Sequence, residues 1–307
     1  MQNDRQKKAG LKKTLSRFGW NYVFVLPGII LLFLFSYLPM TGILAAFKDY
    51  RIELGLWDSE WVGLRYFSFI KDPYFWQSVK NTLIITSLRL VVNVPMQIIF
   101  ALMINELANG KFKKFVQSAS YIPYFISWIV VAYILNTMLA LDTGVINSFL
   151  SSLSLDQIFF MGEVKYFRPL IIISYLWKNL GWGAIIYIAA LANVDPQLHE
   201  AAKIDGAGRL ARIWHINIPS IIPTIVILLI LTMPTLLAAG YDQILPLSNP
   251  ANMSVSDVLD VYVIRLGISQ AQYSVSTAIG LVLSVVNLIL VVVTNSISRK
   301  VSETSLW

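Results

Sequence analysis

The chain has 307 residues, of which 56% are hydrophobic and 13% are charged, and its formal net charge is +7. Soluble globular domains carry about 25% charged residues, so this composition excludes a single water-soluble core and indicates an integral membrane protein. The chain contains no cysteine, which excludes disulfides, thiolate metal sites and cysteine nucleophiles.

Six apolar runs are long enough to cross a bilayer as helices, which takes about 20 residues each. The first run is too long for a signal-peptide core and no clear A-x-A cleavage site follows it, so we expect it to remain as a span. The predicted fold class is therefore all-α, a polytopic membrane protein with six transmembrane helices. These helices are predicted at 22–47, 78–107, 115–141, 169–192, 218–247 and 274–297.

Lysine and arginine residues predict the orientation of the chain, because they concentrate in cytoplasmic loops. Seven of the 24 lie in the alternate loops 48–77, 142–168 and 248–273. Fourteen lie in the segments 1–21, 108–114, 193–217 and 298–307. Both termini are therefore expected in the cytoplasm. We expect a basic N-terminal segment at 1–21, a membrane domain at 22–297 and a cytoplasmic tail at 298–307.

The loop at 193–219 is unusually polar for a connection between two spans. Asp195-Pro196 is a good helix start, since Asp can cap the helix and Pro suits its first position. Asp205-Gly206 is a turn signal, because glycine can adopt the positive φ that ends a helix. The run "AGRLARIWHINI" then predicts a second helical piece. A compact helix-turn-helix with small residues and flanking charges suits docking of a soluble partner, although a self-packed linker is the simpler alternative.

The stretch "EAAKIDGAGRLARIWHINIPSIIP", from Glu200 to Pro223, resembles the EAA loop of binding-protein-dependent ABC importer permeases. It has the E-A-A triplet, the D-G-A triplet three residues later, an apolar run and a proline pair, placed between the fourth and fifth of six spans. The stretches "NTLIITSLRLVVNVPMQIIFALMINEL" and "LWKNLGWGAIIYIAALANVDPQLHEAA" and the ending "SETSLW" resemble the carbohydrate-uptake class, in particular permeases for oligosaccharides and polysaccharide fragments.

The resemblance implies a type I ABC importer permease fold in a bacterial cell membrane, and a division of labour between subunits. This chain would pair with a second, homologous permease subunit, and two cytoplasmic ATPases would bind ATP and Mg²⁺. An extracytoplasmic solute-binding protein would deliver the oligosaccharide, which would cross by alternating access. The sequence contains no G-x-x-x-x-G-K-[ST] phosphate loop, so this chain is expected to bind no cofactor itself.

The resemblance also implies roles within the loop. The triplet alanines would form a close-packing face, Asp205 and Gly206 would set the turn, and Ala207, Leu210 and Ile213 would pack the second helix onto its own bundle. His199 and His215 are expected to be solvated or hydrogen-bonded rather than metal ligands. The residues expected to couple the permease to the ATPase are Glu200, Ala201, Ala202, Asp205, Gly206, Ala207 and Leu210.

Apart from Lys80 and Glu106 at the ends of the second span, the charged residues within predicted spans are Arg89, Lys178 and Asp242. Charged residues within spans are rare and often functional. They could pair with each other or reach for the interface, or they could line a polar cavity. Sugar sites combine aromatic faces with amides and charges, and two cations in one cavity would suit an acidic sugar. The predicted substrate-path residues are Arg89, Trp177, Lys178, Asn179, Trp182, Tyr241, Asp242, Gln243 and Asn287.

Other functions are disfavoured by what the sequence lacks. A secondary sugar transporter with an intramembrane ion site is the main alternative, but it would need an ion or proton site. Apart from Glu106 at the end of the second span, Asp242 is the lone acid in the predicted spans. An enzyme is not expected, because neither G-x-S-x-G nor H-E-x-x-H occurs. Nucleic-acid binding is disfavoured, because the basic residues are spread over the inner loops.

Overall fold

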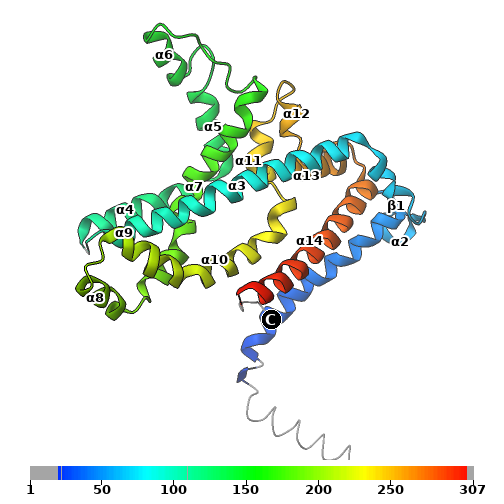
Figure 1. The fold of residues 1–307 in the computed structure, drawn as a ribbon. Coiled ribbons are helices and arrows are strands. Elements are labelled where there is room, and N and C mark those ends of the chain that lie inside the picture. Colours follow the sequence, from blue (N-terminus) through cyan, green and yellow to red (C-terminus); the bar gives the residue numbers. More distant parts are fainter. Residues whose placement is uncertain (1–19, 22, 109, 303–307) are drawn as a thin grey trace, which may run out of the picture.

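The structure is a computed structural model that describes residues 20–21, 23–108 and 110–302. The described chain is almost entirely helical (Figure 1). Most of the predicted N-terminal segment 1–21 and the second half of the predicted tail 298–307 lie outside the described residues. The ending "SETSLW" falls almost wholly in that undescribed part.

Five helices of the described residues are long and apolar enough to cross a membrane, and there are six such spans if a bent helix pair is counted as one. The predicted all-α polytopic fold is therefore confirmed, with boundaries close to those expected for most spans. The five are Val23–Phe47, Pro73–Glu106, Val164–Ala192, Arg209–Thr232 and Tyr273–Ile297, and the bent pair is Lys111–Phe125 with Trp128–Met138.

Two predicted spans are not the continuous helices that the sequence suggested. The third is bent by 95° between Phe125 and Trp128. The fifth ends at Thr232 rather than at 247, because the chain continues as a 3₁₀ turn, Met233–Leu237, and then leaves helical geometry. Gly240, with φ +79°, precedes the separate short helix α11, Tyr241–Ile244. The extra apolar residues after 232 therefore belong to a break and not to the span.

The main helices are α3 (Pro73–Glu106), α4 (Lys111–Tyr121), α5 (Trp128–Met138), α7 (Val164–Ala192), α10 (Ile218–Thr232) and α14 (Tyr273–Ser302). The short helices are α2 (Gly55–Asp58), α6 (Val145–Ser152), α8 (Pro196–Ile204), α9 (Arg209–Arg212), α11, α12 (Met253–Ser256) and α13 (Leu259–Ile264). Strands β1 (Lys48–Asp49) and β2 (Glu60–Trp61) form a small antiparallel pair after the first span.

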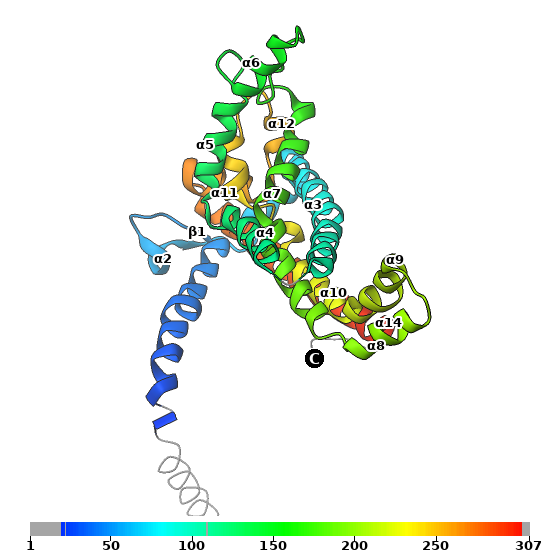
Figure 2. The same ribbon diagram turned by 90° about the vertical axis from the view of Figure 1, so that its left-hand side faces the viewer.

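The long helices pack in two groups. Helices α3 and α7 lie side by side along much of their length, while the last part of the first span, Leu38–Phe47, runs beside α14. The earlier part of that span diverges from α14 (Figure 2). Helix α10 contacts both α7 and α14. In both views α8 and α9 lie toward the same end of the molecule as the C-terminal end of α14, and α6 lies at the opposite end (Figure 2). The loop at 193–219 and the C-terminal end therefore lie on the same side of the membrane, because the chain crosses it an even number of times between them.

Helix α3 carries a continuous polar stripe on its buried side. Ser78, Asn81, Thr82, Thr86, Arg89 and Asn93 are all buried. In contrast, large apolar side chains of the first span, such as Phe24 and Phe35, are exposed. An exposed apolar surface together with a buried polar stripe is the distribution expected where lipid surrounds the helices and polar groups must find partners inside.

Candidate functional site

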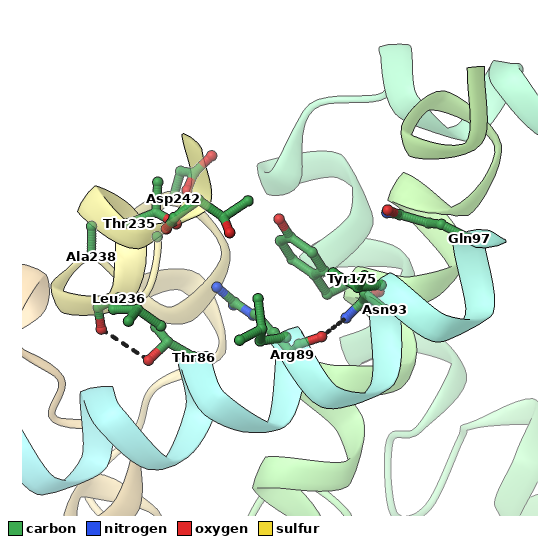
Figure 3. Close-up of a pocket in the computed structure, with 13 residues that line it drawn as sticks. Thr86, Arg89, Asn93, Gln97, Tyr175, Thr235, Leu236, Ala238 and Asp242 are labelled. Carbon is green, nitrogen blue, oxygen red and sulfur yellow. Dashed lines mark hydrogen bonds between the residues drawn. The ribbon is translucent and has the colours of Figure 1, made fainter. Parts of the chain in front are cut away.

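A cavity of 390 Å³ lies beside the polar stripe of α3, and Figure 3 shows its lining. One side of the cavity is formed by a single face of α3, whose lining residues are three or four positions apart: Thr86, Arg89, Asn93 and Gln97. Tyr175 of α7 and Asp242 of α11 line the facing sides. The cavity therefore combines a cation, amides, an aromatic ring and a carboxylate, which are the groups that bind sugar hydroxyls and carboxylates.

Arg89 is 9% exposed and is held by three contacts. Its Nη1 donates to the carbonyl oxygen of Ala239, and its Nη2 donates to Oε1 of Gln243. Its guanidinium also lies over the ring of Tyr175, 4.3 Å from the centroid. Arg89 thus ties α3 to the non-helical break at 238–240, where a carbonyl would otherwise lack a helical partner in the membrane.

The break itself depends on Gly240 and on Asp260 of α13. The positive φ of Gly240 is one that side-chain-bearing residues rarely adopt, and its N–H donates to Oδ2 of Asp260 at 2.8 Å. Burial raises the pKa of the Asp260 carboxyl, and the hydrogen bond from Gly240 opposes that rise. The break is therefore stabilised from two sides, by Arg89 and by Asp260.

A second cavity, of 550 Å³, lies next to the bend of the third span. The bend residues Tyr124–Ile129 line one side, and Lys178 and Asn179 of α7 line the other. Tyr175 and Asp242 line this cavity as well as the first. The two cavities therefore meet along Tyr175 and Asp242, and together they form the candidate path through this chain.

The charged residues Arg89, Lys178 and Asp242 line the cavities but do not pair with one another. Within the described residues the ion pairs are Asp49–Arg51, Glu163–Lys165 and Asp257–Arg265. Lys178, which is 6% exposed, instead donates its Nζ protons to the backbone oxygens of Pro123, Tyr124 and Ile126. Of the alternatives left open by the sequence, the structure therefore favours cavity lining over mutual pairing, and both cations bind backbone carbonyls.

Four of the nine predicted substrate-path residues line these cavities, namely Arg89, Lys178, Asn179 and Asp242. Gln243 does not, because it is buried and bonded to Arg89, to the Ile171 carbonyl and to Ser174 Oγ. The other four lie outside both cavities: Trp177 and Tyr241 are exposed, Trp182 stacks on Tyr124, and Asn287 is half-buried on α14.

Sequence reasoning missed Asn93, Gln97 and Tyr175. The signal for the amides was present, because they continue the stripe that contains Arg89 at helical spacing. Tyr175 begins the aromatic stretch 175–183, but no sequence feature distinguishes it from Trp177 or Trp182 as a cavity-lining residue. Only the packing of α7 against α3 decides which of these rings faces inward.

The 193–219 loop has the helix-turn-helix form that was predicted. Asp195 caps α8 by accepting a hydrogen bond from the Gln197 N–H at 2.9 Å, with Pro196 at the first position. At the other end Gly206 has φ +82°, and the N–H of Ala207 donates to the Ala202 carbonyl at 2.8 Å. With the 3.1 Å bond from the Gly206 N–H to the Lys203 carbonyl, this is a complete Schellman motif.

The second helical piece of the loop packs differently from the prediction. Ile213 packs against the cluster formed by α3, α7 and α10, as expected. Leu210 does not, because its side chain is 73% exposed. Ile204, at the end of α8, is 87% exposed, and Leu198 and Trp214 are exposed as well. The loop therefore presents four large apolar side chains outward instead of burying them in its own bundle.

The sequence match is decisive for the family. Residues 97–303 match the binding-protein-dependent transport system inner membrane components. The chain belongs to this family. Protein LplB of Bacillus subtilis (strain 168) is 44% identical over 95% of this chain and 92% of that protein. The polygalacturonan/rhamnogalacturonan transport system permease protein YteP of the same strain is 41% identical over 99% of this chain and 95% of that protein.

The fold agrees with a solved structure of this kind. A bacterial ABC transporter involved in the import of the acidic polysaccharide alginate matches with a TM-score of 0.88 and 37% identity, over 95% of this chain and 99% of that chain. The predictions of a multi-pass cell-membrane protein and of a permease of an ABC oligosaccharide importer, rather than an enzyme, are confirmed. The alternative of a secondary transporter gains no support.

Proposed function

We propose that this permease imports acidic oligosaccharides. The observation that carries the proposal is the charge of the two joined cavities, whose lining includes Arg89 and Lys178 as cations and Asp242 as the sole carboxylate. The two cations outnumber the single carboxylate, and an excess of one sign of charge raises the local concentration of ions of the opposite sign. The likeness to an importer of acidic alginate and to a permease for polygalacturonan/rhamnogalacturonan supports the same substrate class.

Arg89 is the residue that we assign to substrate carboxylates. Both terminal nitrogens of its guanidinium hold protein groups, but each carries a second proton that these bonds leave unused. Asn93, one turn further along α3, has an Oδ1 atom with no partner among the described residues. Thr86, Asn93 and Gln97 would bind hydroxyls along the same helix face.

The energy for import would come from partner ATPases. The 193–219 loop is suitable for docking because it carries four large exposed apolar side chains, Leu198, Ile204, Leu210 and Trp214. Exposed apolar surface outside the membrane is typical of protein interaction sites. We assign the loop to the cytoplasmic side, where two ATPase subunits would bind ATP and Mg²⁺. A second permease subunit and an extracytoplasmic solute-binding protein would complete the importer, as in the family.

The substrate class is tested in the reconstituted importer. ATP hydrolysis is measured with binding protein that has been loaded with alginate pentasaccharide, with a polygalacturonate oligosaccharide of the same length, or with neutral maltopentaose. We expect severalfold stimulation with an acidic sugar and none with maltopentaose. Equal stimulation by the neutral sugar would overturn the acidic assignment, and an importer that hydrolyses no ATP with any of them would overturn the coupled mechanism.

The docking role of the loop has its own test, which the absence of native cysteines makes simple. Ile204→Cys is expected to cross-link to a cysteine placed in the cleft of the ATPase surface that faces the membrane. Val145→Cys, on α6 at the opposite end of the molecule, serves as the control and should not cross-link. Equal yields from the two positions would contradict the assignment.

A further inference from the structure

Local sequence features account for the bend in the third span. Helix α4 runs into the 3₁₀ turn Ile122–Phe125, whose second residue is Pro123. Helix α5 restarts after Ser127, whose side chain caps it by accepting a hydrogen bond from the Val130 N–H. Such a break leaves carbonyl groups without helical partners, and in a membrane each unsatisfied group costs several kcal/mol.

Lys178 of α7 meets those carbonyls. Its Nζ donates to the backbone oxygens of Pro123, at 3.3 Å, and of Tyr124 and Ile126. Since an ammonium group has three protons, all of its donors are occupied. The rings of Tyr124 and Trp128, on either side of the bend, lie 5.2 and 5.4 Å from the same nitrogen, which adds cation–π attraction.

The backbones of α7 and α4 are held close enough for this reach. A Cβ atom at Gly181 would lie 2.3 Å from the carbonyl oxygen of Ser120, so the two helices touch there without side chains between them. One residue further, Trp182 stacks on Tyr124 at a centroid distance of 4.3 Å and an angle of 5°. The position of Lys178 relative to the bend is therefore fixed by packing on both sides.

We propose that Lys178 is a positioning residue that holds the third span in its bent form and thereby fixes one wall of the transport path. The bend residues Tyr124–Ile129 form that wall of the 550 Å³ cavity. Because its three protons are all bonded to backbone oxygens, Lys178 acts on transport through the wall and makes no hydrogen bond to the sugar. The proposal rests on the proposed function only in that this cavity lies on the path.

The bend can be measured with spin labels, since the chain has no cysteine. Ser118 of α4 and Asn136 of α5 are both exposed and can be replaced by labelled cysteines in the assembled importer in lipid. At a rise of 1.5 Å per residue the two Cα atoms would be about 27 Å apart in a straight helix, and about 18 Å apart with the 95° bend. Double electron–electron resonance resolves this difference.

We expect Lys178→Met to move the distance distribution toward the longer value, while Lys178→Arg, which keeps donors, retains the shorter one. Lys165→Met, an exposed lysine on the same helix, is the matched control and should change nothing. Sugar imported per ATP should fall severalfold for Lys178→Met and recover in Lys178→Arg. If Lys178→Met does not assemble, Lys178→Gln, with fewer donors, should give an intermediate distribution.

A short distance that persists in Lys178→Met, or in Lys178→Gln where that variant is used, would overturn the role of Lys178 in the bend. A longer distance with unchanged import per ATP would overturn the link between the bend and the path. The distance is measured without sugar, so this test can fail or succeed whatever substrate the importer carries. It is thereby separate from the test of the acidic-sugar assignment.

Discussion

Replacing Gly206 by alanine should destabilise the C-terminal end of α8 by about 1–2 kcal/mol, the cost of a left-handed conformation for a residue with a Cβ atom. The φ of Gly206 is +82°. A Cβ atom there would meet no other atom within 4 Å, so the cost is conformational and not steric. This energy lowers the ratio of ordered to frayed helix end roughly 5- to 30-fold.

The effect is large relative to what holds α8 together. The helix has nine residues and none of them is buried, and isolated helices shorter than about 12–15 residues are marginal in water. Its order therefore depends on its two caps, at Asp195 and at Gly206. If α8 transmits force from the ATPase, a frayed end should lower the sugar imported per ATP severalfold, with no change in the amount of permease in the membrane.

Two further variants isolate the backbone effect. Gly208→Ala is the matched control, because Gly208 has φ −68° and equally open surroundings. Gly206→Asn should fall between the two alanine variants, since asparagine tolerates the left-handed region better than alanine does. Import and ATP hydrolysis are measured in the same proteoliposomes. Equal coupling in Gly206→Ala and Gly208→Ala would refute the reasoning from the Schellman motif.

Three other changes have defined outcomes. Glu200→Lys, on exposed α8, should lower import per ATP while leaving membrane insertion intact, as uptake assays and quantitative blots would show. Gly181→Ala would bring a Cβ atom 2.3 Å from the Ser120 carbonyl oxygen and should cost about 1–3 kcal/mol of stability, whereas Gly280→Ala, with open space, should leave the melting temperature of the purified permease nearly unchanged. Burial raises the pKa of the Asp257 carboxyl above its usual 3.8. Its charged form therefore destabilises the fold increasingly as the pH rises from 3.8 through the raised pKa. Over that pH range the stability of Asp257→Asn should increase relative to the unsubstituted chain, and a constant difference in stability would contradict this.

Features that depend on neighbouring residues were predictable from the sequence. The number of spans follows from apolar length, and the 193–219 loop follows from a cap, a turn and a glycine within eleven residues of one another. The caps at Asp195 and Gly206 are formed by hydrogen bonds between residues that are two to five positions apart. No distant contact is needed to determine them.

Features that depend on distant contacts were not predictable. Pro123 lies in an apolar run that is long enough for one continuous span. The bend there is stabilised in the membrane by Lys178, which is more than 50 residues away in the sequence. The fifth span ends early because Arg89 and Asp260, from two other helices, stabilise the break around Gly240. Hydropathy alone extends the helix across both breaks.

The helix breaks at 122–127 and 238–240 are stabilised in the same way, and this explains why the membrane domain contains buried cations. Each break exposes carbonyl oxygens, and each is met by a cation from an unbroken neighbour, Lys178 on α7 and Arg89 on α3. The cost of burying each cation is offset by the hydrogen bonds that the break supplies. Irregular backbone and buried charge therefore stabilise each other, and they do so beside the two cavities that meet at Tyr175 and Asp242. The presence of two cations beside the cavities is then a consequence of how the two breaks are stabilised.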